Sequence, residues 1–305
     1  MFKGRKVLQY TIMVMVAVFF IKTIGIVLAY NGVIPNFTDN DYSYNFDSDH
    51  NKDNYLFKFG TKNIHDLDFD NYKYSPKKEF NFTSDMKDCS SIELNATVGE
   101  IIFNDSKDNK FHAKVSVTLK SNTLKSVPSD YITFSDGNVI NIHERNLDSS
   151  KNKNIHSTFY ISIPSNYKNK VDVSSDVGDI KGKINGSDLV VKSDVGAINL
   201  SNSNSESIDL QSDVGAIKLD LSNSKFKNVK CNSDVGAVKL TGVKPENLNL
   251  DLSVDIGDIR LNGEYGNIIK QPNDSFGSKH VKKTIGNGEK NITLSANTGD
   301  VSISN

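Results

Sequence analysis

The chain has 305 residues with a formal net charge of −1, and hydrophobic residues make up only 37% of it. So small a net charge creates no global field that would attract nucleic acid, and the absence of Trp excludes a sugar-binding cleft built on indole rings. The length suffices for one large hydrophobic core or two modest ones.

The first element predicted along the chain is an apolar segment, residues 7–30, interrupted by a single charge at Lys22. Such a segment can cross a bilayer, whose hydrocarbon core takes about 20 residues. Basic residues precede it, whereas residues 31–51 hold four Asp and no Lys or Arg. The positive-inside rule therefore predicts a single-pass anchor in the cell membrane, with residues 1–30 forming a basic cytoplasmic tip and the membrane helix, and an extracellular remainder. The alternative is a cleaved signal peptide with its apolar region at residues 7–21, which exports the same remainder.

Residues 31–88 are crowded with Asp, Asn, Tyr and Lys and show no sustained hydrophobic period. This composition favours a polar, partly disordered stalk. The aromatic residues between Tyr42 and Phe59 offer a second possibility, because they can pack as a small cap on the domain that follows.

A repeat dominates the second half of the chain. The string Ser-Asp-Val-Gly, followed by Ala or Asp and an aliphatic residue, recurs at glycine spacings of 18, 19, 21, 21 and 42 residues, the last being two periods of 21. A related copy lies upstream. The glycines of the seven copies are Gly99, Gly178, Gly196, Gly215, Gly236, Gly257 and Gly299. Repetition at such a period is typical of solenoids.

Aligned on the glycine, the copies place aliphatic residues in fixed columns, as at Ile208, Leu210 and Val214 of one copy. This period of two predicts a strand with one buried face. After the glycine the aliphatic positions shift by one residue, as at Ile217, which indicates a corner where glycine tolerates positive φ. No copy can bury its apolar face alone, so the copies must stack. We therefore predict an all-β fold, a parallel β-solenoid with rungs of about 20 residues, preceded by the transmembrane helix and the stalk.

The solenoid domain is predicted to cover residues 89–305, with its clearest rungs in residues 171–261. Residues 104–170 fit the repeat less well, and residues 262–290 replace one corner with a long excursion. Strands are expected in the irregular part at residues 111–119, 131–134, 138–142 and 155–163, with a hairpin turn at 135–138. Cys231 stands in an inward column and Cys89 lies upstream of the first copy, so no disulfide between them is expected.

This pattern resembles the bacterial putative-adhesin family of unknown function, whose members combine an N-terminal membrane helix, a strand ending in Pro and repeated Ser-x-x-Gly-Asp-Ile units. The strand ending at Pro164 and the units at Val177–Ile180, Ile256–Ile259 and Thr298–Val301 carry the resemblance, whereas the middle copies have Ala after the glycine. The resemblance covers residues 89–305 and implies the fold. It brings no functional residues, because the family has no agreed activity.

A column of acidic residues is expected on the outer surface, two residues before each corner glycine. Its members are Asp176, Asp194, Asp213, Asp234 and Asp255. Carboxylates stacked at the rung spacing of about 4.8 Å repel one another. The favoured explanation is an Asx-turn, in which each Asp accepts a hydrogen bond from the corner backbone two residues on. A row of weak Ca²⁺ sites is the alternative, and no other metal or cofactor is predicted.

A column of basic residues is expected three residues after the glycine. Its members are Lys181, Lys218, Lys239 and Arg260. They form either a solvated face or a surface for an anionic cell-wall polymer. The six histidines lack metal or triad spacing, and no phosphate-binding loop or nucleophile elbow occurs. A polysaccharide-active β-helix enzyme is therefore the weakest hypothesis.

The last copy, residues 292–303, runs almost to the C-terminus without an evident cap. Its strand edge would permit self-association, unless residues 262–290 cover it. The sequence thus predicts a non-enzymatic cell-surface or cell-envelope binding module, tethered to the membrane by residues 7–30. Its expected partner is a wall polymer or another envelope protein, and not nucleic acid. A self-assembling scaffold and an accessory subunit of an envelope sensor are the alternatives.

Overall fold

The computed structural model describes residues 74–120, 126–145, 155–202, 205–222, 224–269 and 277–305. The expected membrane anchor, residues 7–30, and most of the expected stalk lie outside these ranges. Within the described ranges, no helix is long and apolar enough to cross a membrane. These ranges contain nineteen strands and one short helix, α3 (Tyr265–Ile268).

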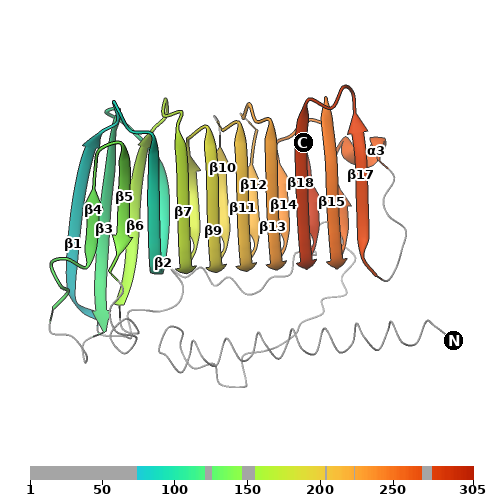
Figure 1. Ribbon diagram of the computed structural model, residues 1–305. Helices are drawn as coiled ribbons and strands as arrows, with labels where there is room; N and C mark the ends of the chain where they lie inside the picture. The colour runs from blue at the N-terminus through green and yellow to red at the C-terminus, as the bar shows by residue number, and fades with distance from the viewer. Residues whose placement is uncertain (1–73, 121–125, 146–154, 203–204, 223, 270–276) are drawn as a thin grey trace, which may run out of the picture. The chain divides into compact units, whose positions relative to one another are not determined.

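The repeat folds into stacked rungs, each with one strand before the glycine corner and one after it (Figure 1). Six rungs break at the corner: β7 (Lys170–Val177) and β8 (Ile180–Ile184), β9 (Asp188–Val195) and β10 (Ile198–Asn202), β11 (Ser207–Val214) and β12 (Ile217–Asp220), β13 (Asn228–Val235) and β14 (Val238–Thr241), β15 (Leu248–Ile256) and β16 (Ile259–Leu261), β18 (Lys290–Thr298) and β19 (Val301–Ile303). A seventh rung is the long strand β2 (Ser91–Ser106), which runs through its corner.

An eighth rung lacks the corner glycine. β5 (Val139–Glu144) and β6 (Ile155–Pro164) pair in parallel with the two halves of β2, and Ser157 stands opposite Gly99. The remaining strands finish the stack, and they are β1 (Tyr74–Asp85), β3 (Lys110–Lys120), β4 (Ile132–Ser135) and β17 (Lys279–Ile285). The four strands expected in the irregular part are thus confirmed as β3 to β6, and the expected turn joins antiparallel β4 and β5.

The strands form two layers, which we name by their place in the rung. The pre-corner sheet has the order β4-β5-β2-β7-β9-β11-β13-β18-β15-β17, and the post-corner sheet has the order β1-β3-β6-β2-β8-β10-β12-β14-β19-β16. Neighbours are parallel throughout the rungs, and antiparallel pairs occur only at the ends. The expectation of an all-β, parallel-rich solenoid is confirmed.

The core lies between the two layers and consists of the predicted aliphatic columns. In β11 the side chains of Ile208 and Leu210 are buried, and in β12 those of Ile217 and Leu219 are buried as well. A fully buried aliphatic side chain contributes about 1.5–3 kcal/mol, and each rung supplies several such side chains only because its neighbours cover them. Cys89 and Cys231 are both free and buried.

Glycine is required at the corner for two reasons. The seven corner glycines have φ between +145° and +159°, where other residues are strained. The rungs also stack so closely that a Cβ at Gly215 would lie 1.9 Å from the carbonyl oxygen of Gly196. The same close approach recurs from rung to rung, so the column of glycines sets the rung spacing at the corner.

The rungs do not stack in the order of the sequence. The last rung, β18 with β19, lies between the β13–β14 rung and the β15–β16 rung (Figure 1). The last copy therefore does not lie at the end of the stack, and both of its strands are paired on both sides. Asn297 of this rung donates a hydrogen bond to Asp234 Oδ1 at 3.1 Å, and it separates Asp234 from Asp255, whose carboxylates in-order stacking would place in adjacent rungs.

Both ends of the pre-corner sheet are closed by antiparallel strands. The excursion expected at residues 262–290 supplies β17, which pairs with β15. It therefore covers the strand edge of the terminal rung, which was one of the two alternatives considered for this segment. β17 exposes Lys282 and Lys283 at this edge, and charged edge strands resist pairing with another chain. Self-association through a C-terminal strand edge is therefore not supported.

The folded unit begins before residue 89. Residues 74–85, expected in the stalk, form β1, which pairs antiparallel with β3 along almost its whole length. Phe82 of β1 stacks on Phe134 of β4 with ring centroids 4.6 Å apart. These contacts continue the core, so residues 74–85 belong to the folded unit and not to the expected stalk.

Candidate binding surface at the glycine corner

The acidic column lies on the exposed outer face of the pre-corner sheet, close to the corner. In the described structure, none of its five carboxylates accepts a hydrogen bond from the corner backbone, so the expected Asx-turn is wrong. The donor is already in use, because the N–H of Gly215 donates to the carbonyl of Val235 in the next rung at 2.9 Å. The hydrogen bond between rungs thus takes the place of the hydrogen bond that an Asx-turn would make within one rung.

Neighbouring carboxylates of this column lie close enough to raise one another's pKa. Burial raises the pKa of Asp213, and the neighbouring carboxylates of Asp194 and Asp234 raise it further. The pKa of Asp176 is raised by burial and by Asp194. A cation near the column would relieve this repulsion.

Binding of Ca²⁺ to the acidic column stays a prediction. Across the described ranges, no group of three or more His, Cys, Asp or Glu side chains is placed to hold a metal ion. The column offers one carboxylate per rung, whereas Ca²⁺ takes six to eight oxygen ligands. Such a row would have to recruit waters and carbonyls for most of its coordination.

The residue directly after the glycine divides the rungs into two kinds. At the ends of the stack it is acidic, and at the centre it is Ala197, Ala216 or Ala237. Two of these acidic residues accept hydrogen bonds from backbone N–H groups of the neighbouring rung. Asp179 Oδ1 accepts from the N–H of Ala197 at 2.8 Å, and Asp300 Oδ1 accepts from the N–H of Asp258 at 2.9 Å. The central alanines leave these positions without a carboxylate.

The basic column is accordingly neutralised at both ends and not at its centre. Lys181 forms an ion pair with Glu100, and Arg260 pairs with Asp300 at 2.8 Å. Ser302 of the inserted rung also separates Arg260 from the other members. Lys218 and Lys239 stand opposite each other in adjacent rungs, and within the described part of the chain they make no ion pair. We call these two residues the central lysine pair.

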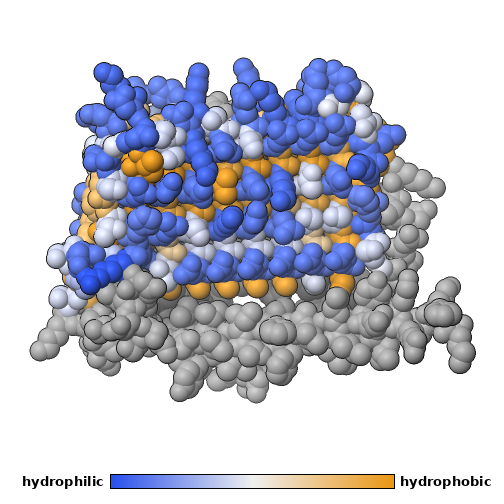
Figure 2. Space-filling view, viewed as in Figure 1, coloured by the Kyte–Doolittle hydropathy of each residue, from blue (hydrophilic) through white to orange (hydrophobic). Residues whose placement is uncertain are grey.

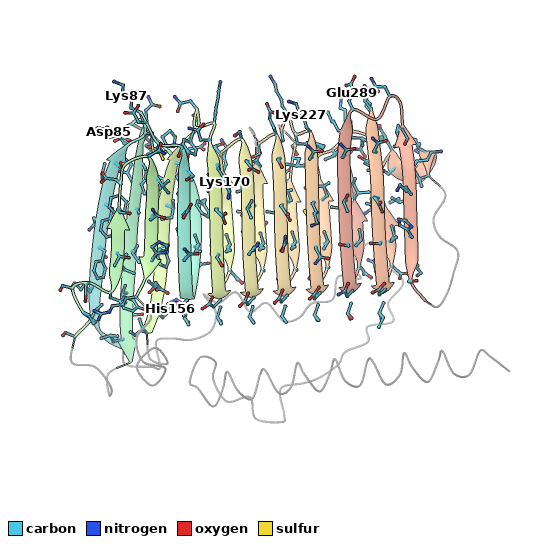
Figure 3. The ribbon with its side chains drawn as sticks, in the orientation of Figure 1. Asp85, Lys87, His156, Lys170, Lys227 and Glu289 are labelled. Atoms are coloured by element: carbon cyan, nitrogen blue, oxygen red, sulfur yellow. The ribbon has the colours of Figure 1, made fainter. Side chains whose placement is uncertain are left out.

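An apolar ridge runs along the corner between the two charged columns, and sequence reasoning missed it. The residue before each glycine was expected to point inward, yet Val195, Val214 and Val235 are only half-buried. Figure 2 shows a hydrophobic row along the strand ends, beneath a hydrophilic row, and Figure 3 shows short side chains projecting beyond those ends. We call the residue before each corner glycine, together with Ala197, Ala216 and Ala237 after the three central ones, the corner ridge. The shift of buried face at the glycine was the signal that this column leaves the core.

Charged side chains on the opposite rim are paired instead. Lys170 contacts Asp172 at 2.8 Å and Lys227 contacts Glu206 at 2.7 Å, and Figure 3 places Lys170, Lys227 and Glu289 toward that rim.

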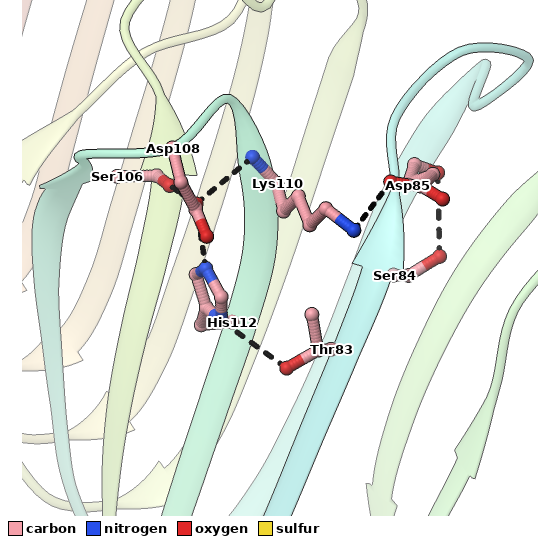
Figure 4. Close-up of polar contacts among 7 residues, drawn as sticks. All are labelled: Thr83, Ser84, Asp85, Ser106, Asp108, Lys110 and His112. Atoms are coloured by element: carbon pink, nitrogen blue, oxygen red, sulfur yellow. Dashed lines mark hydrogen bonds and ion pairs between the residues drawn. The ribbon is translucent and has the colours of Figure 1, made fainter.

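One histidine lies in a polar cluster that its sequence spacing did not reveal (Figure 4). His112 Nε2 contacts Asp108 Oδ1 at 2.7 Å, and its Nδ1 lies 3.1 Å from Thr83 Oγ1. Hydrogen bonds from His112 and Ser106 lower the pKa of Asp108 to about 2. The side chains of His112 and Asp108 are 38% and 52% exposed, and catalytic stabilisation needs a water-excluded site. The cluster therefore fastens β1 to the β2–β3 hairpin.

A buried carboxylate closes the N-terminal end of the core, and sequence reasoning also missed it. Glu144 points inward at the end of β5, where the equivalent columns hold small residues. It accepts hydrogen bonds from the N–H groups of Thr97 and Val98, and Tyr131 lies 3.5 Å away. Burial raises its pKa. The alternation of Ile140, Ile142 and Glu144 was the available signal.

Comparison with known proteins identifies the family. The family model described as Toastrack DUF4097 matches residues 89–269, more than half of the chain. The protein therefore belongs to this family, which confirms the resemblance carried by the Gly-Asp-Ile units. Comparison with curated proteins gives no match.

The solved structures that resemble the chain have low sequence identity to it. A "putative cell adhesion protein" from Clostridium sporogenes is 16% identical with a TM-score of 0.43, and the match covers 75% of this chain and 99% of that one. A "putative adhesin" from Bacteroides fragilis is 14% identical with a TM-score of 0.33, covering 75% and 97%. A "putative lipid binding protein" from Parabacteroides distasonis is 12% identical with a TM-score of 0.28, covering 74% and 96%.

Proposed function

We propose that the protein is a non-enzymatic binding or adhesion module of the cell envelope, tethered to the membrane by residues 7–30. Membership of the Toastrack family suggests a binding type of role. The anchor is supported by the length and flanking charges of the apolar segment.

The central lysine pair is the part of the surface that we propose contacts an anionic envelope polymer. The single observation that carries this proposal is that Lys181 and Arg260 form ion pairs, whereas Lys218 and Lys239 form none in the described structure. Lys218 has only the longer-range attraction of the Asp220 carboxylate. The difference follows from Ala197 and Ala216 of the preceding rungs, which stand where Glu100 and Asp300 supply the partners of Lys181 and Arg260. Two adjacent ammonium groups about 4.8 Å apart present repeated positive charge to a polymer of phosphates or carboxylates.

Co-sedimentation with isolated cell walls tests this proposal. The chain from residue 31 onward is mixed with walls at low salt, beside a tube without walls. We expect pelleting only with walls, and weaker pelleting at high salt because exposed charges are screened. Each exposed contact is worth roughly 0.5–1 kcal/mol, so the double substitution Lys218→Ala with Lys239→Ala should weaken binding roughly 5- to 30-fold.

A matched variant controls for the loss of charge alone. Lys192 and Lys225 are exposed lysines away from the basic column, and neither makes an ion pair in the described structure. The double substitution Lys192→Ala with Lys225→Ala should leave pelleting unchanged. Equal losses from both double variants would show that net charge, and not the central pair, attracts the wall. Supernatant protein in both tubes would remove the wall as ligand.

A further inference from the structure

The corner ridge separates an unpaired acidic column from an unpaired basic pair within the same rungs. In the rung of Gly215 the order across the corner is Asp213, Val214, the glycine, Ala216 and, on the far side, Lys218. The neighbouring rung of Gly236 repeats this order. In the described structure neither Asp213 nor the central lysine pair forms an ion pair, and the two charged columns flank an apolar strip.

This arrangement is complementary to itself under one symmetry operation. A two-fold axis parallel to the solenoid axis places two ridges face to face with their rungs in register. It puts the acidic side of each copy against the basic side of the other, so Asp213 faces Lys218 of a second copy. A two-fold axis across the ridge would place acid against acid, which costs energy at these spacings.

We propose that a second copy of this chain docks on the corner ridge, in parallel and in register. The half-buried valines of the two copies cover one another, and the flanking charges select the parallel orientation. Symmetric pairs of identical surfaces are the commonest form of protein association.

The size of the ridge makes this association weak. An aliphatic residue precedes the glycine in six of the seven glycine rungs, with Thr298 in the other. Seven rungs span about 29 Å, and a width of about 10 Å gives a footprint of roughly 300 Å² per copy. Stable complexes bury about 1,200–2,000 Å² in total, and smaller contacts are transient. A trapping experiment is therefore the suitable test.

Disulfide trapping follows directly from the symmetry, because each ridge residue faces its own equivalent. Val214→Cys is introduced into the full chain in detergent micelles, and the protein is oxidised mildly. Val190→Cys is the matched control, since Val190 is equally half-buried but lies on the outer face of the pre-corner sheet, away from the corner. The native thiols of Cys89 and Cys231 are buried. Maleimide labelling first establishes that each new thiol is accessible.

We expect a disulfide-linked dimer from Val214→Cys and none from Val190→Cys. Within Val214→Cys, either Asp213→Lys or Lys218→Asp should reduce the linked fraction several-fold, and the two together should restore it. An accessible but unlinked thiol at position 214, or equal linkage at both positions, would overturn the proposal. So would an inaccessible thiol at position 214, because another segment would then cover the ridge, or a charge exchange that fails to restore linkage.

Discussion

The neutral side chain of Asn297 separates two carboxylates, so replacing it with Asp should weaken the fold. Asn297 lies between Asp234 and Asp255, and it donates a hydrogen bond to Asp234 Oδ1 at 3.1 Å. Asn297→Asp removes this donor and creates two new pairs of like charges at the rung spacing. It also keeps the size and branching of the side chain, so packing is unchanged.

The magnitude follows from Coulomb's law. Two charges about 4.8 Å apart repel by about 0.9 kcal/mol in bulk water and by about 3.5 kcal/mol at an effective dielectric of 20. The column is exposed, so the lower value applies to each of the two pairs. With about 0.5–1 kcal/mol for the lost hydrogen bond, the free energy of unfolding should fall by roughly 2–3 kcal/mol.

Urea unfolding followed by circular dichroism measures this loss. The control is Thr293→Asp, which adds the same charge to the same strand at an exposed position between Lys230 and Asp251. The new carboxylate is attracted by Lys230 and repelled by Asp251, and these two effects cancel. The free energy of unfolding should therefore change by no more than about 0.5 kcal/mol. Most of the loss in Asn297→Asp should disappear in 1 M salt, where the Debye length is about 3 Å. Equal effects of the two variants, or a loss indifferent to salt, would refute the electrostatic account of rung order.

Three further substitutions test other parts of the structure. Gly215→Ala should lower the free energy of unfolding by more than about 3 kcal/mol, because its Cβ would lie 1.9 Å from the carbonyl oxygen of Gly196 in the preceding rung. Gly137→Ala, with φ +142° and open space around it, should lower it much less in the same urea titration. Burial raises the pKa of Glu144 above its ordinary 4.5, so the folded state favours the proton and stability falls as pH rises from 4.5 through the folded-state pKa. Glu144→Gln should remove this fall and stabilise the protein at neutral pH, and unchanged pH dependence would contradict the assignment. Ala197→Asp should place a carboxylate beside Lys218 of the next rung, as Glu100 stands beside Lys181, and reduce wall pelleting as strongly as loss of that lysine; undiminished pelleting would argue against the central pair.

The columns of the repeat were enough to predict the strands and the corners. Apolar residues at a period of two specify one buried face, and a glycine at the point where the face shifts specifies a corner. The order of the rungs was beyond this reasoning, because every copy has the same columns and can pair with any other. We infer that Asn297 and Ser302, which look in the sequence like minor departures from the repeat, favour the observed order. They are neutral and lie between charged residues of the two neighbouring rungs.

The surface was less predictable than the core for a related reason. Each Asp of the acidic column was expected to accept a hydrogen bond from the backbone N–H of its own corner glycine. That N–H instead donates to a carbonyl oxygen of the next rung, as Gly215 N–H does to Val235. Likewise, the basic column was expected to be either a solvated face or a polymer surface, but Lys181 and Arg260 form ion pairs with acidic residues that only the terminal rungs carry. Partners contributed by a neighbouring rung are invisible to an analysis of one copy at a time.

The position of the last rung is tested most directly with the native thiol of Cys231. In β13 this residue stands opposite Leu294 of the inserted β18, and Leu252 of β15 lies one rung further away. Adjacent rungs bring Cα atoms to about 4.8 Å, which suits a disulfide, whereas two rungs place them about 9.6 Å apart, which does not. Each variant, Leu294→Cys or Leu252→Cys, is refolded under oxidising conditions, and its disulfides are mapped by mass spectrometry. The inserted rung predicts a link from Cys231 to position 294 and none to position 252, and the reverse result would show that the rungs stack in sequence order.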